Sequence, residues 1–205
     1  MSVEQQPPKK KPIALAITIV LLVCSLNGNM FLYSQYLSNI QEKKYETGQR
    51  VASDAIGAAA FYNAVLPELE KLGKSAELLE RNEAKFSAGA AFRHVDHVMG
   101  YLKEAHQYKG TEFASGKLEA YFNAVQQSLA KVGGHEGALT AAEQAYLTKL
   151  QQAFSKQLEA VMAFNTDALE SRSLSIQIGN GYNNWLEIAD KLEQAIDEHT
   201  DARLH

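Results

Sequence analysis

The 205-residue chain contains very little cysteine and little proline. Its one cysteine, Cys24, cannot form an internal disulfide. Without a Cys-x-x-Cys pair, the sequence excludes thiolate zinc sites, thioredoxin-like redox motifs and covalent haem attachment. Four prolines are few, as expected for long helices, in which proline removes a backbone hydrogen bond. The chain also lacks a basic cluster after its first 12 residues, and its net charge is −4. This argues against nucleic acid as a partner.

Catalytic motifs are missing as well. There is no Gly-x-Ser-x-Gly nucleophile elbow. The stretch GKLEAYF (116–122) lacks the second glycine and the preceding strand of a phosphate loop. Glu68 and Glu70 suit the first turn of a helix better than an acid–base pair. We therefore expect neither an enzyme nor a bound cofactor.

The clearest positive feature is an uncharged run, IALAITIVLLVCSLNGNMFLY (13–33). As a helix it would be about 31 Å long, roughly the thickness of the hydrocarbon layer of a membrane. Lys9, Lys10 and Lys11 precede it, and Tyr33 and Tyr36 fall where aromatic rings collect at the outer interface. The positive-inside rule then predicts a cytoplasmic tail (1–12), a single transmembrane signal-anchor helix (13–36) and an extracytoplasmic domain (37–205) at a bacterial cell membrane.

Two other ways of holding the domain remain open. The first is a cleaved signal peptide, although no clear Ala-x-Ala site follows the apolar core. The second is a lipoprotein acylated on Cys24, although Val23 stands where a lipobox has a small residue. All three alternatives place the domain outside the cytoplasm.

The domain itself has the apolar spacing of helices, in steps of three and four residues. We expect helices over 37–73, 75–108, 113–132, 140–168 and 184–196. Pro67 either kinks the first of these or begins a new helix. Thr140 and Glu143 form a capping-box pattern, and Asn184 with Glu187 suits another cap. Only SLSIQI (173–178) has an alternating, strand-like pattern. The predicted fold is all-α, with a transmembrane helix that continues into an antiparallel bundle of four or five helices.

The stretch RHVDHVMGYLKEAHQY (93–108) contains the main candidate site. Five of its polar side chains form a stripe beside the expected core stripe: His94, His97, Tyr101, Glu104 and Tyr108. We interpret this stripe as the boundary of the core, because histidine and tyrosine combine apolar bodies with polar tips. The alternatives are a protein or small-ligand surface and a metal or haem site. Di-iron carboxylate bundles resemble this pattern only superficially, since they need Glu-x-x-His on two helices and this chain has none. We therefore expect no metal.

A second candidate is NGYNNW (180–185), which places Tyr182 and Trp185 among amide side chains. Loops that bind sugars or peptides have similar compositions. The same residues also make an ordinary turn before a helix, and we favour the turn.

An anchor followed by a helical bundle is similar to the external sensing modules of bacterial receptors. Such receptors carry a cytoplasmic output domain, and we expect only about 12 cytoplasmic residues here. Our first hypothesis is therefore an interaction protein with a protein partner or a second copy of itself: a scaffold, assembly factor or accessory subunit of a membrane complex. The alternative is a ligand-binding or sensor module that acts through a membrane partner. A buried pocket among the helices, lined by His94, His97 and Tyr101, would favour the sensor. A continuous stripe of apolar or small residues left exposed on the first helix would favour the interaction protein.

Overall fold

The computed structural model describes residues 13–199 and 203–204, except for the side chain of Ala14. The basic cluster Lys9–Lys11, on which the predicted membrane orientation depends, lies outside these residues. The described residues are 84% helical and contain no strand, which confirms the all-α prediction. The chain divides into two units, Met1–Glu42 and Lys43–His205, which we describe separately.

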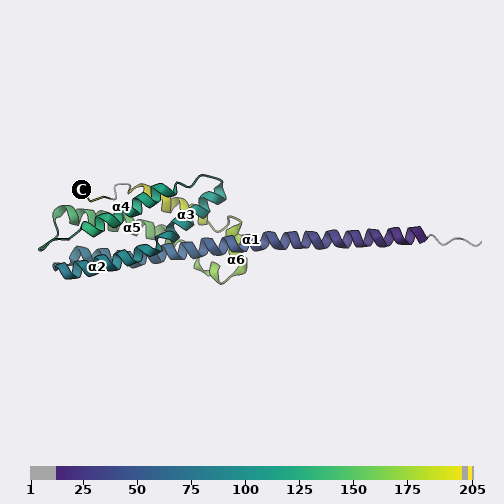
Figure 1. The fold of residues 1–205 in the computed structure, drawn as a ribbon, viewed down its shortest axis with the longest axis horizontal. Helices are drawn as coiled ribbons and strands as arrows, with labels where there is room; N and C mark the ends of the chain where they lie inside the picture. Colours follow the sequence, from purple (N-terminus) through teal and green to yellow (C-terminus); the bar gives the residue numbers. More distant parts are fainter. Residues whose placement is uncertain (1–12, 200–202, 205) are drawn as a thin grey trace, which may run out of the picture. The chain divides into compact units, whose positions relative to one another are not determined.

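The described part of the first unit is the beginning of α1 (Ile13–Lys74), the long helix drawn in purple to blue in Figure 1. Its apolar side chains, such as Leu21 and Phe31, are 64% and 62% exposed and have no protein core to cover them. An 18-residue window of this helix has a mean hydropathy of 2.0. Within residues 13–199 and 203–204, the protein therefore has one helix, near the N-terminus, that is long and apolar enough to span a membrane.

The second unit contains the rest of α1 and all the other helices (Figure 1). In chain order these are α2 (Leu78–Ala91), η1 (Phe92–His94), α3 (Val95–Lys109), α4 (Ser115–Lys131), α5 (Ala141–Met162), η2 (Thr166–Leu169), α6 (Arg172–Gly179) and α7 (Trp185–Asp197).

One hydrophobic core holds this unit together. Phe61 of α1 lies at its centre and is fully buried. Its ring makes edge-to-face contacts with rings of three other elements, at centroid distances of 5.2 Å to Phe92 of η1, 5.8 Å to Phe122 of α4 and 5.8 Å to Phe154 of α5. Aromatic pairs in this geometry stabilise a core beyond the apolar area that they bury. The cluster joins four elements that are far apart in the sequence.

Two of the expected helix boundaries are wrong. The helix predicted over 75–108 is interrupted by the 3₁₀ turn η1. Its core stripe fits an unbroken helix equally well, so the sequence pattern could not reveal the interruption. The helix predicted over 140–168 ends at Met162. There the side chain of Asn165 accepts a hydrogen bond from the backbone N–H of Asp167 at 3.0 Å and begins η2. Such local side-chain bonds compete with continued helix.

No new helix begins at Pro67, because α1 continues through it. Glu68 and Glu70 therefore do not lie in a first turn. Each pairs with a lysine of the same helix, Glu68 with Lys71 at 2.6 Å and Glu70 with Lys74.

The strand-like pattern SLSIQI forms α6 instead, packed closely on α1. A Cβ added at Gly48 of α1 would lie 1.8 Å from the carbonyl oxygen of Ser175, and one added at Gly179 would lie 2.0 Å from that of Lys44. The alternating pattern is a poor guide here because contact with a second helix buries small residues, Ser175 and Gly179, along with Ile178.

Candidate functional site

The candidate stretch 93–108 lies on η1 and α3, and its side chains differ widely in exposure. His94, His97 and Glu104 are half-buried, and Tyr108 is 42% exposed. Tyr101 is fully buried, so it belongs to the core and not to its boundary. The predicted stripe is therefore not uniform, and each member is best understood from its own contacts.

His97 of α3 lies against α1. Its Nδ1 is 3.0 Å from Oδ1 of Asp54. A Cβ added at Gly57 would lie 2.3 Å from the His97 ring, and one added at Gly100 would lie 2.4 Å from the Asp54 carboxylate. The two side chains thus occupy space that the two glycines leave free. Burial raises the pKa of Asp54, and the contact with His97 opposes that rise.

Glu104, two turns further along α3, also pairs with α1. Its carboxylate accepts a hydrogen bond from Nε of Arg50 at 2.9 Å. This bond is the main reason that the pKa of Arg50 lies above its ordinary value. Two of the five stripe residues therefore connect α3 to α1, with 39% of the His97 side chain and 15% of the Glu104 side chain exposed.

Tyr101 and Tyr108 connect α3 to the stretch before α7. The hydroxyl of Tyr101 donates to the carbonyl oxygen of Trp185 at 2.8 Å, and burial raises its pKa. The hydroxyl of Tyr108 donates to the carbonyl oxygen of Asn180 at 2.6 Å. Gly181, at φ +83°, leaves the space that the Tyr108 hydroxyl occupies, because a Cβ there would lie 2.3 Å from that oxygen.

Both sequence candidates meet at this place. Trp185 is fully buried, its Nε1 donates to the carbonyl oxygen of Ile178 at 2.9 Å, and its ring lies 5.8 Å from that of Tyr108. Tyr182 is 66% exposed. Asn184 does begin α7, but it has φ 55° and its side chain makes no capping bond, so the expected side-chain cap is wrong. Asparagine tolerates this left-handed conformation and uses it to turn the chain.

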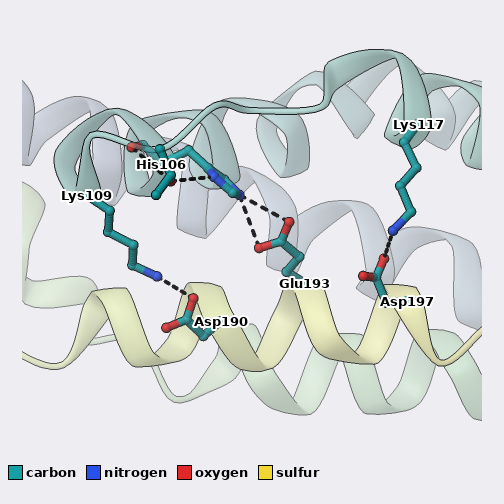
Figure 2. A network of polar contacts seen from close by, with 7 residues as sticks. His106, Lys109, Lys117, Asp190, Glu193 and Asp197 are labelled. Atoms are coloured by element: carbon teal, nitrogen blue, oxygen red, sulfur yellow. Dashed lines mark hydrogen bonds and ion pairs between the residues drawn. The ribbon is translucent and has the colours of Figure 1, made fainter.

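A further polar network connects α3 and α4 to α7 (Figure 2). Nε2 of His106 lies 3.1 Å from both carboxylate oxygens of Glu193, and its Nδ1 lies 2.8 Å from Oγ1 of Thr111. Two ion pairs flank it, Lys109–Asp190 and, at 2.7 Å, Lys117–Asp197. Three carboxylates of α7 are therefore used to hold α7 in place.

The two histidines that could have shared a metal ion do not form a site with other ligands. The rings of His94 and His97 are nearly parallel, with centroids 6.3 Å apart. Nε2 of His94 accepts a hydrogen bond from Nε of Arg93 at 3.1 Å. Within residues 13–199 and 203–204, no three His, Cys, Asp or Glu side chains are grouped to hold an ion.

Sequence reasoning missed a buried charged cluster at the turn between α4 and α5. Arg81 of α2 is fully buried and donates to the carbonyl oxygens of His135 at 2.6 Å and Gly137 at 2.7 Å. A Cβ added at Gly133, which has φ +59°, would lie 2.8 Å from the Arg81 side chain. The glycines and histidine of VGGHEG (132–137) were the available signal, but nothing in the sequence pairs this turn with Arg81.

Glu143 completes this cluster and confirms the predicted capping box. Its carboxylate accepts from the backbone N–H of Gly133 at 2.7 Å, from the backbone N–H and hydroxyl of Thr140 at 2.8 and 2.9 Å, and from Nε2 of His135 at 3.0 Å. Burial raises the pKa of Glu143, but these hydrogen bonds outweigh it and lower the pKa to about 2. The pKa of His135 is raised, first by its bond to the carbonyl of Glu136 and then by Glu143.

Comparisons with protein-family models, with curated proteins and with solved structures find no match for this chain.

Proposed function

We propose that this protein is a membrane-anchored interaction module: a scaffold, assembly factor or accessory subunit that acts through contact with another protein. In this proposal α1 spans the cell membrane once, the N-terminus is cytoplasmic, and the unit Lys43–His205 is an antiparallel helical bundle outside the cytoplasm. The long apolar N-terminal helix and the basic residues Lys9–Lys11 that precede it in the sequence support the anchor.

The observation that carries the proposal is the contrast between two surfaces. On α3 the polar side chains that a ligand or a reaction would require are used between helices: His97 with Asp54, Glu104 with Arg50, and His106 with Glu193. On α2, by contrast, two large apolar side chains are left in solvent, Leu79 at 68% and Phe86 at 80% exposure. Exposed apolar patches rimmed by polar residues are typical of protein-interaction sites.

Within the second unit this exposed apolar surface is on α2, whereas the first helix leaves large apolar side chains exposed only in the first unit, among them Leu37 at 42% and Ile40 at 37%. Between Lys43 and Lys74, the apolar side of α1 faces the core, with Val51, Phe61 and Leu69 fully buried. The sensor alternative has weaker support, because the Tyr101 hydroxyl already has a backbone partner and the ring is buried.

Site-specific photocrosslinking in living cells tests the proposal. A photoreactive residue is placed at Phe86 and, as a matched control, at Tyr182, which is similarly exposed but far along the chain. We expect a discrete protein adduct from position 86 and none from position 182. No adduct from position 86, together with an increase in thermal stability caused by a small-molecule extract of the cell envelope, would replace the proposal by the sensor alternative.

A further inference from the structure

The side chain of His135, in the turn between α4 and α5, has an acceptor at each ring nitrogen. Its Nδ1 lies 3.0 Å from the carbonyl oxygen of Glu136, and its Nε2 lies 3.0 Å from the carboxylate of Glu143. A carbonyl oxygen and an ionised carboxylate cannot donate, so the ring must carry a proton on each nitrogen to make both bonds. A neutral ring has a single N–H and keeps only one of them. The geometry therefore requires the imidazolium form.

His106 is a useful contrast, because its ring can make all these contacts while it is neutral. Its Nε2 lies 3.1 Å from the carboxylate oxygens of Glu193, and its Nδ1 lies 2.8 Å from the hydroxyl oxygen of Thr111. A hydroxyl group can donate as well as accept, so a neutral ring can donate through Nε2 and accept at Nδ1. Loss of a proton therefore removes a hydrogen bond from His135 and none from His106.

The turn that contains His135 also holds the beginning of α2. The buried guanidinium of Arg81 donates to two carbonyl oxygens of this turn, those of His135 and Gly137. Gly133 and Gly137 both have positive φ, and ordering a glycine costs more conformational entropy than ordering any other residue. The bonds between His135 and Glu143 therefore help to fix the carbonyl oxygens to which Arg81 donates.

Little else holds this end of α2. Apart from Arg81, the buried residues of the helix are all alanines, which bury little apolar surface: Ala84, Ala88 and Ala91. The side chain of Glu77 makes no capping bond at the start of the helix. A helix end with few buried apolar contacts opens locally at a small free-energy cost. The first residues of α2 (78–83) therefore depend on Arg81 more than the rest of the helix does.

From these contacts we infer that His135 is a pH-sensitive latch for the beginning of α2. As an imidazolium it connects the Glu136 carbonyl to the Glu143 carboxylate and fixes the turn that accepts the hydrogen bonds of Arg81. When the ring loses a proton, one of its two bonds is lost, the turn is held less firmly, and residues 78–83 open more often.

The direction of the switch follows from the groups around His135. The bond to the Glu136 carbonyl and then the Glu143 carboxylate of α5 raise its pKa, whereas desolvation and the positive charge of Arg81 in α2 oppose the rise. The pKa in the folded state is above the ordinary 6.5, so the latch is closed below pH 6.5 and opens as the pH rises through the folded value. Glu143, with a pKa of about 2, stays ionised throughout.

The latch needs no partner, but its role as a regulator rests on the proposed function. α2 carries Leu79 and Phe86, the exposed apolar side chains on which the proposed contact depends. Leu79 lies within residues 78–83, so opening of this segment changes the surface that a partner meets. Contact with the partner is therefore expected to be tighter in mild acid than in mild alkali.

Hydrogen exchange of the full chain in a non-ionic detergent tests the latch. Protection factors, which remove the intrinsic effect of pH on exchange, are compared at about pH 5.5 and about pH 8.5, on either side of the transition. We expect the protection of residues 78–83 to fall roughly tenfold at the higher pH, as when one hydrogen bond to a charged group is lost. The middle of α5, around the fully buried Leu150, should keep its protection.

Two variants separate the latch from a general effect of pH. The His135 side chain is 43% exposed, so His135→Gln should leave the fold intact, which circular dichroism checks. In this variant residues 78–83 should be poorly protected at both pH values, whereas the control His106→Gln should keep the change seen in wild type. A wild type without this change, a change that persists in His135→Gln, or one that His106→Gln also abolishes would each overturn the inference.

Photocrosslinking from position 86 at the same two pH values distinguishes the latch from the proposed function. A higher yield of adduct at the lower pH supports both. A change in protection without an adduct at either pH would overturn the proposed function and leave the latch standing. An adduct of equal yield at both pH values would overturn the regulation, and an adduct without any change in protection would overturn only the latch.

Discussion

The carboxylate of Glu143 provides the sharpest test of how the second unit is held together. Removing its charge by Glu143→Gln leaves a single amide oxygen where a carboxylate accepts from Gly133, Thr140 and His135. The full shift of its pKa, from 4.5 to about 2, corresponds to about 3 kcal/mol. Because solvent reaches this turn and screens the charges, we expect Glu143→Gln to lower the free energy of unfolding by about 1–3 kcal/mol.

The pH dependence has a definite sign. The pKa of Glu143 is lowered in the folded state, so its contribution is complete above the unfolded value of 4.5 and is lost as the pH falls towards about 2. The pKa of His135 is raised, so its contribution is complete below the unfolded value of 6.5 and is lost as the pH rises through the folded value. The difference between wild type and Glu143→Gln should therefore be largest between about pH 4.5 and 6.5.

The assay follows the fluorescence of Trp185, the only tryptophan, which is fully buried in the second unit. Urea unfolding of the full chain is recorded at several pH values for the wild type, for Glu143→Gln and for Glu136→Gln. The last is the control, because only the backbone carbonyl of Glu136 contacts His135. A difference between wild type and Glu143→Gln that stays constant from pH 6 down to pH 2 would refute the reasoning.

Three further predictions use the same fluorescence assay. Tyr101→Phe should lower the free energy of unfolding by about 1–2 kcal/mol, because it removes the buried hydrogen bond that the Tyr101 hydroxyl donates to the carbonyl oxygen of Trp185. No loss would show that this hydrogen bond does not contribute. Gly48→Ala should lower the free energy of unfolding by about 1–3 kcal/mol, because its Cβ would overlap the carbonyl of Ser175. The control Gly116→Ala has open space around it and should not destabilise the protein. Equal effects of the two changes would contradict the close packing of α1 on α6. Joint replacement of His94 and His97 by alanine should lower the free energy of unfolding by about 1–2 kcal/mol in total. Zinc, iron or a chelator should not shift the melting of wild type or variant, and a metal-induced rise in the wild type alone would establish a metal site.

The sequence was a good guide wherever a pattern is local. The period of the apolar residues identified the helical content, and the Thr140–Glu143 capping box is present as predicted because its partners are three residues apart. The uncharged run after residue 12 likewise identified the helix that, among the residues that the structure describes, is long and apolar enough to cross a membrane.

Features that depend on distant residues could not be predicted. Tyr101 has the spacing of a boundary residue, and contacts with distant residues make it part of the core: Phe164, at a ring-centroid distance of 6.1 Å, and Trp185, 84 positions later. His97 pairs with Asp54 of α1 and not with its neighbour Asp96, because Gly57 and Gly100 bring the two helices together. In the sequence, Arg81 looks like a surface residue of an amphipathic helix. It is buried because the turn at 133–137 covers it and accepts its hydrogen bonds.

The central claim is that one helix anchors an interaction module on the outside of the cytoplasmic membrane, and topology tests it most directly. Two reporters are fused in turn after His205 of the full chain, one active only outside the cytoplasm and one active only inside it. The account predicts activity of the first reporter in the membrane fraction and none of the second. Activity of the cytoplasmic reporter alone would contradict both the anchor's orientation and the place of the second unit.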